Sequence, residues 1–458
     1  MSALTPYGWL VILWITAIPF QYGYHISVLN QLHSVMSCEH AHVLHHLPTC
    51  FESLDDFTFS VVTSVFNLGG LLGSSQASDL MERLGRKGSA RISSFLIALG
   101  SALMSFSGSV AALAIGRFLV GIGCGIGICL APLYLNEVAP RNIASTVGVL
   151  TQMGIVIGIF LTQLLGVFFT SSNSGPNPSN SWRIVLFFSF AISLTQFFGT
   201  SVMIESPRFL RSQSLRAAED ARSIERRIWS ERESDSVESP LLDERDPEAH
   251  PSVPHNASSP LRVSQVLFKT PTNVRIPLVI ISCAMVGQQF SGINAVLYYS
   301  NDILSQALPE SGKYKLGRKP LLFLSVAGAV TSLIILGLGL DFAGASGSQG
   351  PTAWTTVSSV FIVFFVMSFA IGLGPVPFVM IPEISPFHAV SALSTIALTL
   401  NWLTNFSVSL LFLPLRNALS GGPPNSPNHD PGKVGHVFWI FAAVLTLVMG
   451  IVWSKWKT

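Results

Sequence analysis

The sequence predicts an all-α protein that crosses a membrane many times, and three observations support this fold class. Hydrophobic residues make up 49% of the 458 residues and charged residues only 11%, which is too little charge to coat a soluble globule of this size. Apolar segments long enough to span a bilayer recur along the whole chain. The formal net charge is only +2, so we predict no nucleic-acid partner.

About eleven apolar segments have the length and composition of membrane spans. Polar residues from Gln21 to His25 interrupt the first one, and no small-residue cleavage site follows it. We therefore expect a retained helix rather than a signal peptide. The expected spans are residues 9–29, 58–80, 90–108, 112–135, 147–169, 183–204, 276–300, 320–341, 352–382, 389–414 and 436–454.

Positive charge is unevenly distributed among the connecting segments. The segments 31–57 and 170–181 contain neither lysine nor arginine, whereas 82–91 and 205–275 are rich in both. Because basic loops stay on the cytosolic side of a membrane, the N-terminus and the two basic segments are predicted to be cytosolic. Residues 31–57 are then expected outside.

The basic segment 205–275 divides the chain into two parts. Its first portion, about residues 211–229, has a helical pattern, and the rest is rich in Ser, Pro, Glu and Asp. Such a composition buries too little apolar surface to offset the entropy lost on ordering. We therefore predict an N-terminal six-helix bundle at 1–204, a cytosolic linker at 205–275 and a C-terminal bundle at 276–458.

The two predicted bundles carry an internal repeat. The sequence RLGRKGSAR at 83–91 is echoed by KLGRKPLL at 315–322, and each precedes an apolar segment. The end of another apolar segment, 132–137, is echoed by 375–383. Repeats in the same order and orientation are typical of transporters built by parallel duplication, whose substrate site lies at the interface of the halves.

The sequence QQFSGINAVLYY at 288–299 places three amides, Gln288, Gln289 and Asn294, within an apolar span. Side-chain amides in hydrocarbon need hydrogen-bond partners, so these residues are expected to face the protein interior or a water-filled cavity. On a helix they share one broad face with Tyr299. That face could hold a polyol.

Seven motifs together resemble the sugar porter branch of the major facilitator superfamily over nearly the whole chain, and in particular fungal proteins of its vacuolar protein sorting group. The resemblance implies a major facilitator fold of two helical bundles. The motifs are ERLGRK at 82–87, GRFLVGIG at 116–123, PLYLNEVAP at 132–140, ESPRFL at 205–210, QQFSGINAVLYYS at 288–300, GLGPVPF at 372–378 and NWLTN at 401–405.

The resemblance implies a set of sugar-binding residues in both halves. An amide offers two donors and an acceptor, so it can bind neighbouring hydroxyls without the desolvation cost of a charge. Outside these motifs, a buried amide more often makes an interhelical hydrogen bond. The implied substrate-binding residues are Gln152, Gln288, Gln289, Asn294, Phe378, Asn401 and Trp402.

Phe378 departs from the tryptophan usual in the family, so it keeps an aromatic surface but loses an indole donor, and packing against lipid or core is its alternative role. Pro375 and Pro377, with Gly372 and Gly374, are expected to break the tenth helix of the family pattern beside it.

The first helix of proton-coupled relatives has an aspartate where this chain has His25, opposite an arginine that Arg117 matches. A neighbouring cation favours a neutral histidine, so the resemblance implies facilitated diffusion rather than proton symport. A histidine hydrogen-bonded in the bundle core is the alternative interpretation, and it also lacks the acid.

The family closes its cytosolic side with ion pairs between loop arginines and glutamates at helix ends. Ala144 and Val390 stand where the family has arginines, and this loss is expected to shift the inward/outward balance without preventing folding. Lys87 and Glu82 are more simply read as solvated charges. The implied gating and coupling residues are His25, Arg117, Arg83, Arg86, Glu137, Glu205, Arg208 and Glu383.

The eighth helix of the family pattern is missing from the sequence, which leaves a C-terminal bundle of about five helices. Residues 301–314 lead directly to KLGRK at 315–319. Either this linker crosses the bilayer with its charges, which lipid disfavours, or KLGRK lies outside and the later loops invert. We interpret the chain as a splice variant or an imperfect gene model, which transcript sequencing across Tyr314–Lys315 tests.

These features predict alternating-access transport of a hexose or related polyol by a monomer in the plasma or vacuolar membrane. The alternative is a non-transporting sensor or sorting factor on the same scaffold, or an inactive variant. No enzyme activity, cofactor or metal site is predicted, because the soluble segments show neither a nucleophile–base set nor a metal motif. Cys38 and Cys50 share the outer loop and could form a disulfide.

Overall fold

The structure is a computed structural model, and it describes residues 4–456 with internal gaps. Compact packing divides the chain into two units. Unit 1 comprises Met1–Val35, His42–Cys50 and Leu68–Ser258, and unit 2 comprises Met36–Ala41, Phe51–Asn67 and Ser259–Thr458. The residues outside the description are 1–3, 38–42, 45–46, 53, 141–142, 171–180, 214, 231–265, 267–270, 293–317, 346–352, 375, 387–388, 423–429 and 457–458.

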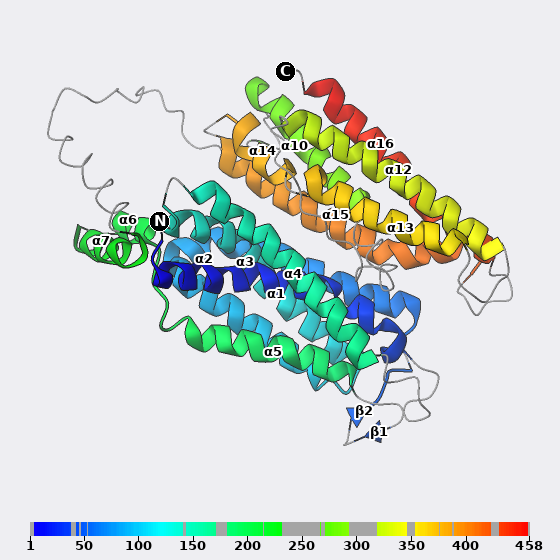
Figure 1. Cartoon of the computed structure of the whole chain (residues 1–458), viewed down its shortest axis with the longest axis horizontal. Helices are drawn as coiled ribbons and strands as arrows, with labels where there is room; N and C mark the ends of the chain where they lie inside the picture. Colours follow the sequence, from blue (N-terminus) through cyan, green and yellow to red (C-terminus); the bar gives the residue numbers. More distant parts are fainter. Residues whose placement is uncertain are drawn as a thin grey trace. The chain divides into compact units, whose positions relative to one another are not determined.

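Unit 1 is built from long apolar helices followed by two short helices of polar sequence (Figure 1). A small antiparallel hairpin follows the first helix. Its strands, β1 (Val43–Leu44) and β2 (Leu47–Pro48), have two residues each. The helices are α1 (Pro6–Met36), α2 (Asp56–Ser105), α3 (Val110–Val138), α4 (Ala144–Thr170), α5 (Trp182–Gly199), α6 (Pro207–Gln213) and α7 (Leu215–Ile228). The first part of α2, residues 56–67, belongs to unit 2.

The helix α2 contains two membrane spans separated by a break at Gly85. Its 50 residues would extend about 75 Å as one straight helix, which is much more than the hydrocarbon thickness of a bilayer. Gly85 has φ 74° and ψ −176°, a backbone conformation that glycine adopts without a Cβ clash. The basic sequence at 82–91 therefore forms a turn between two spans, as the separate segments 58–80 and 90–108 predict.

The helices α1 and α4 approach each other closely through glycines. A Cβ placed on Gly23 would lie 2.0 Å from the carbonyl oxygen of Ile155, and one placed on Gly158 would lie 2.2 Å from that of Phe20. Such contacts require the absence of a side chain, and small residues are the usual means by which membrane helices pack backbone to backbone. The first helix is thereby fixed within unit 1.

Unit 2 contains the remaining helices, one of which is broken. Residues 353–384 form α13 (Ala353–Ser368), a π-helical turn η3 (Phe369–Leu373) and α14 (Val376–Ile384), so the break falls where the glycines and prolines predict it. The other elements of unit 2 are α10 (Thr272–Phe290), α12 (Arg318–Ala345), α15 (Val390–Leu419), η5 (Pro431–Lys433) and α16 (His436–Lys455).

Seven helices of the described chain are long and apolar enough to cross a membrane by length and composition. The doubly spanning α2 is counted once among them. The protein is therefore an integral membrane protein with several spans. The predicted total of about eleven spans is neither reproduced nor excluded by this set.

The helices α10 and α16 run in opposite directions along each other. A side chain placed on Gly287 would meet Met449, and one placed on Gly292 would meet Phe441. Later residues of α10 therefore lie beside earlier residues of α16, which places the start of α10 at the end of α16.

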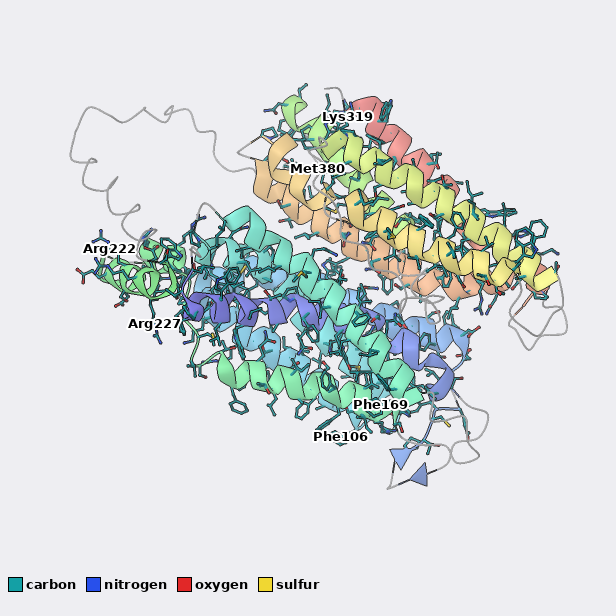
Figure 2. The ribbon with its side chains drawn as sticks, in the orientation of Figure 1. Phe106, Phe169, Arg222, Arg227, Lys319 and Met380 are labelled. Atoms are coloured by element: carbon teal, nitrogen blue, oxygen red, sulfur yellow. The ribbon has the colours of Figure 1, made fainter. Side chains whose placement is uncertain are left out.

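The helix α12 is also antiparallel to α16. Lys319, at the first turn of α12 (Figure 2), donates a hydrogen bond from Nζ to the carbonyl oxygen of Trp456, while Gly337 adjoins Trp439. The helices α10 and α12 therefore begin at the same end of unit 2. On which side of a membrane KLGRK lies stays a prediction, and residues 293–317, which carry the missing-helix prediction, lie outside the described residues.

Cys50 is disulfide-bonded, whereas Cys124, Cys129 and Cys283 are free thiols. The expected partner, Cys38, lies outside the described residues. A disulfide at Cys50 agrees with the prediction that this loop faces a non-cytosolic compartment.

Candidate functional site: a buried amide cluster and two polar networks

Gln288 and Asn401 form a buried amide pair in unit 2. Asn401 donates a hydrogen bond from Nδ2 to Oε1 of Gln288 at 2.7 Å, and the two residues are 8% and 3% exposed. They come from α15 and α10, so the pair joins two helices far apart in sequence. The sequence predicted both residues as members of one site, and the structure brings them into contact.

The Nε2 group of Gln288 donates to the carbonyl oxygens of Leu373 and Gly374, both at 2.8 Å. These carbonyls lie at the end of the π-helical turn η3, where Gly374 N donates to the carbonyl oxygen of Phe369 at 2.9 Å. A carboxamide nitrogen has two hydrogens, so both are engaged at the helix break. Gln288 is thus bonded to three separate partners.

Gln289 adds a third buried amide to the cluster. Its Nε2 lies 3.5 Å from Oε1 of Gln288, while its own Oε1 is buried with no hydrogen-bond partner among the described residues. A buried acceptor without a partner costs free energy, and a ligand hydroxyl or a water would satisfy it. In the described part of the cluster, this oxygen is an acceptor that a ligand hydroxyl could reach.

Trp402 is buried, and its ring makes an edge contact with Phe66 of α2 at a centroid distance of 6.3 Å within unit 2. The other predicted substrate-binding residues are less defined. Asn294 lies outside the described residues, Phe378 belongs to α14 with its side chain undescribed, and Gln152 is an exposed residue of α4 in unit 1. Their roles stay predictions.

His25 is fully buried in unit 1 and belongs to a network of uncharged side chains. Its Nε2 lies 2.6 Å from Oγ of Ser189 and 3.3 Å from Oγ of Ser101. Ser189 also donates to Oε1 of Gln21 at 3.0 Å, and Gln21 donates from Nε2 to Oγ of Ser193 at 2.8 Å. The network connects α1, α2 and α5.

Arg117 contacts the backbone of His25 rather than its ring. Its Nη1 donates to the carbonyl oxygen of His25 at 2.8 Å, and the side chain is 1% exposed. The predicted proximity of the two residues is therefore present, with a carbonyl as the acceptor. Neither Ser101 nor Ser189 was predicted, because a serine in an apolar helix usually bonds to its own backbone and carries no distinctive sequence signal.

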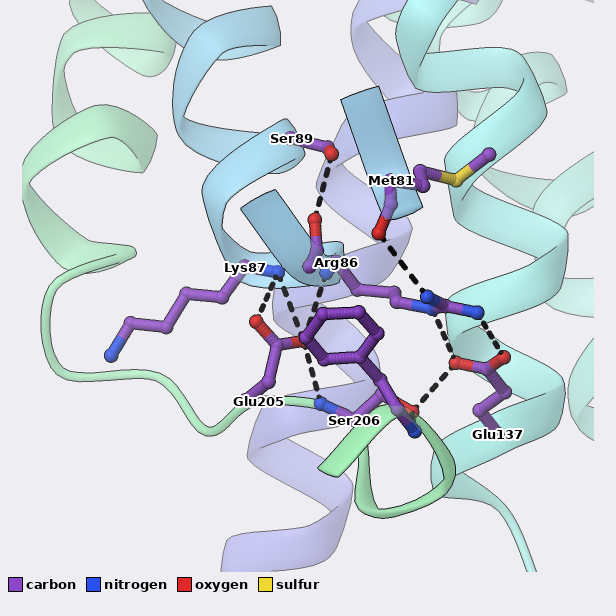
Figure 3. Close-up of polar contacts among 9 residues, drawn as sticks. Met81, Arg86, Lys87, Ser89, Glu137, Glu205 and Ser206 are labelled. Carbon is purple, nitrogen blue, oxygen red and sulfur yellow. Dashed lines mark hydrogen bonds and ion pairs between the residues drawn. The ribbon is translucent and has the colours of Figure 1, made fainter. Parts of the chain in front are cut away.

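A second polar network lies at the start of the second span of α2 (Figure 3). Arg86 donates from Nε and Nη2 to the two carboxylate oxygens of Glu137, both at 2.7 Å. Ser206 donates from Oγ to the same carboxylate at 2.6 Å, and the guanidinium of Arg86 lies 5.0 Å from the ring centroid of Phe209. A bidentate arginine–carboxylate pair of this kind is a strong, geometrically specific contact.

Glu205 accepts backbone hydrogen bonds within the same network. Arg86 N donates to it at 2.9 Å, Lys87 N at 3.2 Å and Ser206 N at 2.8 Å. A Cβ on Gly85 would lie 2.4 Å from the Glu205 carboxylate, so glycine there permits its approach to a helix N-terminus. Burial nevertheless raises the pKa of Glu205, against these donors and the charge of Arg86, which lower it.

Two further predicted gating residues lie at the surface of unit 1. Arg83 and Arg208 are exposed, and Glu383 lies in α14 with its side chain undescribed. Lys87, read from sequence as a solvated charge, donates from Nζ to the carbonyl oxygen of Ser201 at 3.0 Å. Ser206 was missed because the motif directs attention to the charged residues on either side of it.

A third polar cluster, which sequence reasoning did not identify, lies in unit 2 at the first turn of α2. Asp56 accepts hydrogen bonds at Oδ2 from Nη2 of Arg416 and from Nδ2 of Asn417, both at 3.0 Å. Arg416 also donates from Nη2 to Oδ1 of Asn417 at 2.7 Å. The sequence signal that could have identified this cluster is a charged residue next to each of two apolar segments, Asp56 before 58–80 and Arg416 after 389–414.

Comparisons with known proteins agree with this architecture. The chain is 28% identical to a probable metabolite transport protein of Saccharomyces cerevisiae over 95% of this chain and 89% of the relative, and 28% identical to vacuolar protein sorting-associated protein 73 of the same organism over 95% and 90%. It is also 28% identical to solute carrier family 2, facilitated glucose transporter member 3, of Mus musculus over 93% and 85%.

Among solved structures, the inward open conformation of the xylose transporter XylE from E. coli superposes with a TM-score of 0.71 at 22% identity, covering 98% of this chain and 96% of that one. This likeness establishes a shared fold. The family model for sugar (and other) transporters matches residues 10–312 and 314–457. The protein therefore belongs to the sugar (and other) transporter family of the major facilitator superfamily and is a membrane transporter homologue rather than an enzyme.

Proposed function

We propose that this chain moves a monosaccharide, a hexose or a related polyol, across a membrane by alternating access and facilitated diffusion. The observation that carries the proposal is the buried cluster of Gln288, Gln289 and Asn401, in which one amide oxygen has no partner among the described residues. Family membership supports sugar as the class of substrate.

The chemistry of the cluster favours a neutral, hydroxyl-rich substrate. Amides can donate to and accept from hydroxyl groups, and they attract neither anions nor cations strongly. We assign hydroxyl contacts to Gln288, Gln289 and Asn401, with Asn294, Phe378, Trp402 and Gln152 as further contacts on the strength of the resemblance.

The surroundings of His25 support facilitated diffusion. A proton-coupled carrier needs a group that gains and loses a proton during its cycle, and His25 is instead held by neutral serine hydroxyls close to a permanent cation. We therefore propose that transport follows the sugar gradient alone, as the name of the mouse glucose transporter relative also states for that protein.

We propose that the network of Arg86, Glu137 and Glu205 stabilises one conformation of the transport cycle, with Arg83, Arg208 and Glu383 as further gating residues. Its ion pair and backbone hydrogen bonds join α2, α3 and the segment before α6. The same proposal includes two bundles joined by the linker 205–275 and a total of about eleven spans. It also includes a monomeric state and residence in the plasma or vacuolar membrane.

A non-transporting sensor or sorting factor is the second candidate. The helices α10 and α12 begin at the same end of unit 2, and only residues 293–317 lie between their described parts. The sequence of this linker contains no recognisable eighth span, which favours the second candidate. A splice variant or imperfect gene model would account for the same observation.

Sugar uptake in a host that lacks its own hexose transporters distinguishes these candidates. The native chain is compared with a version carrying an apolar helix from a relative inserted between Tyr314 and Lys315, with equal amounts of both proteins verified in the membrane fraction. Uptake by the native chain supports the proposal. Uptake by the restored chain alone identifies the native chain as a defective variant, and uptake by neither supports the sensor.

A further inference from the structure

One end of unit 2 combines lysine side chains with aromatic rings. The helices α12 and α16 are antiparallel, so the first turn of α12 lies beside the last turn of α16. The first turns of α12 contain Lys319 (Figure 2) and Phe323, and the last turn of α16 contains Trp453 and Lys455. We call these four residues the α12–α16 patch.

The aromatic rings hold the ammonium group of Lys319 at the helix ends. Its Nζ donates a hydrogen bond to the carbonyl oxygen of Trp456 and lies 5.5 Å from the centroid of the Trp453 ring. Phe323 packs edge-on against the same ring, with a centroid distance of 4.6 Å and an interplanar angle of 84°. An ammonium has three N–H donors, so further donors remain for an external acceptor.

The patch is positively charged. Among the described side chains, no carboxylate forms an ion pair with Lys319 or Lys455. Lys455 is exposed and Lys319 is half-buried. The carboxylate of Asp341, which pairs with His436, belongs to the end of α12 and the start of α16, and therefore lies at the opposite end of the two helices.

The patch adjoins apolar surface of the kind that faces lipid tails. Trp453 is 61% exposed, and Leu324 and Leu447, farther along the two helices, are 57% and 67% exposed. Tryptophan is enriched where a membrane span meets the headgroups. The start of α10, which follows the predicted cytosolic linker 205–275, lies at this end too, and the cytosolic leaflet is the one that carries anionic lipids.

We propose that the α12–α16 patch binds the headgroup of an anionic phospholipid, with Lys319 and Lys455 contacting phosphate oxygens and Trp453 packing beside the headgroup. A lysine ammonium is a compact charge that binds phosphate well. An anionic lipid is preferred to a zwitterionic one, because only the former brings net negative charge to two lysines. The inference goes beyond the proposed function and does not depend on it, since binding of the lipid requires no transport.

Thermal unfolding of the purified full-length protein in lipid nanodiscs tests the proposal. The nanodiscs contain phosphatidylcholine alone or an equal mixture of phosphatidylcholine and phosphatidylserine. The wild type is expected to have a Tm about 2–4 °C higher in the mixture, and the double variant Lys319→Met/Lys455→Gln should lose at least half of this shift. Lys433→Gln, which removes an exposed lysine of η5 at the other end of α16, is the matched control and should keep the shift.

Equal shifts for the wild type and the double variant would overturn the proposal. An equal loss in Lys433→Gln would also overturn it, because phosphatidylserine would then act through the overall charge of the protein. If the double variant does not fold, Lys455→Gln alone must reduce the shift, and an unchanged shift has the same meaning.

Two further measurements distinguish a lipid from a free anion. Inorganic phosphate added to the wild type in phosphatidylcholine nanodiscs should leave Tm unchanged, and a shift as large as that with phosphatidylserine would show a site for free phosphate instead. Native mass spectrometry of the detergent-solubilised protein should show more phosphatidylserine retained by the wild type than by the double variant. Equal retention would contradict a headgroup site at the patch.

Discussion

Arg86 binds both carboxylate oxygens of Glu137 at 2.7 Å, in an ion pair whose side chains are only 14% and 6% exposed. Ser206 contributes a further hydrogen bond to the same carboxylate. Removing one member of a buried pair leaves the other charge uncompensated, which costs much more than the loss of an exposed surface pair. The pair is thus both a structural contact and a candidate element of the transport cycle.

Glu137→Gln is expected to destabilise the folded protein by roughly 3 kcal/mol, because the guanidinium of Arg86 loses its counter-charge in a largely buried position. Thermal unfolding of the purified protein measures this effect. Lys87→Met is the matched control, since the Lys87 ammonium has a carbonyl rather than a carboxylate as its partner, and it should cost less than about 1 kcal/mol. Equal losses for the two variants would contradict a special role for the ion pair.

Glu205 gives the network a defined pH dependence. Its pKa is raised above the ordinary value of 4.5, chiefly by burial, so the folded state binds the proton more tightly than the unfolded state does. Its contribution to stability is therefore fully present below the unfolded pKa and is lost as pH rises through the folded pKa. The Glu205→Gln variant has no ionisable carboxyl group at this position, so its stability lacks this pH dependence.

We therefore expect the Tm of the wild type to fall relative to that of Glu205→Gln as the pH increases from about pH 4 to pH 7. If the Tm of the wild type instead rises relative to that of Glu205→Gln over this range, the backbone donors outweigh burial and lower the pKa of the Glu205 carboxyl group.

His25 predicts transport without proton coupling. In proteoliposomes, uptake should approach the same plateau with and without an imposed proton gradient, and a protonophore should leave the initial rate unchanged, because the His25 network contains no acid. Ser193→Ala, which removes a hydroxyl from Gln21 rather than from His25, serves as a control for general damage to the network. Accumulation above equilibrium that collapses with the protonophore would refute this account.

The cluster of Asp56, Arg416 and Asn417 predicts a mutual stabilisation between α2 and α15 within unit 2. Asp56→Asn and Arg416→Gln are each expected to cost about 1–2 kcal/mol, and the double variant should cost much less than their sum, because either change removes the same charge-assisted contact. Thermal unfolding of the four proteins measures the coupling. Strict additivity would show that the two side chains act independently.

Several features of the fold were predictable because they depend on local sequence. The last apolar segment, expected at 436–454, is α16 (His436–Lys455), and the segment expected at 183–204 is close to α5 (Trp182–Gly199). Length and hydropathy define such spans whatever they pack against. The break near Pro377 was equally predictable, since a missing N–H affects a helix in any surroundings.

The partners of the functional side chains were less predictable. Sequence motifs identified Gln288 and Asn401, and helical periodicity placed Gln288 on a polar face, but no local pattern indicates that Gln288 donates to the carbonyls of a helix some 85 positions away. Likewise, Arg117 was expected near His25, while its contact with a carbonyl rather than the ring depends on how the helices pack. Contacts of this kind arise from tertiary structure.

The most direct test of the central claim is counterflow of a radiolabelled hexose in proteoliposomes, comparing the wild type with Asn401→Leu and with Gln196→Leu, a buried amide of α5 outside the cluster. We expect saturable exchange by the wild type, a loss of about tenfold or more in apparent affinity for Asn401→Leu, and near-normal exchange for Gln196→Leu. Wild-type exchange no greater than that of protein-free liposomes, or equal effects of the two substitutions, would contradict it.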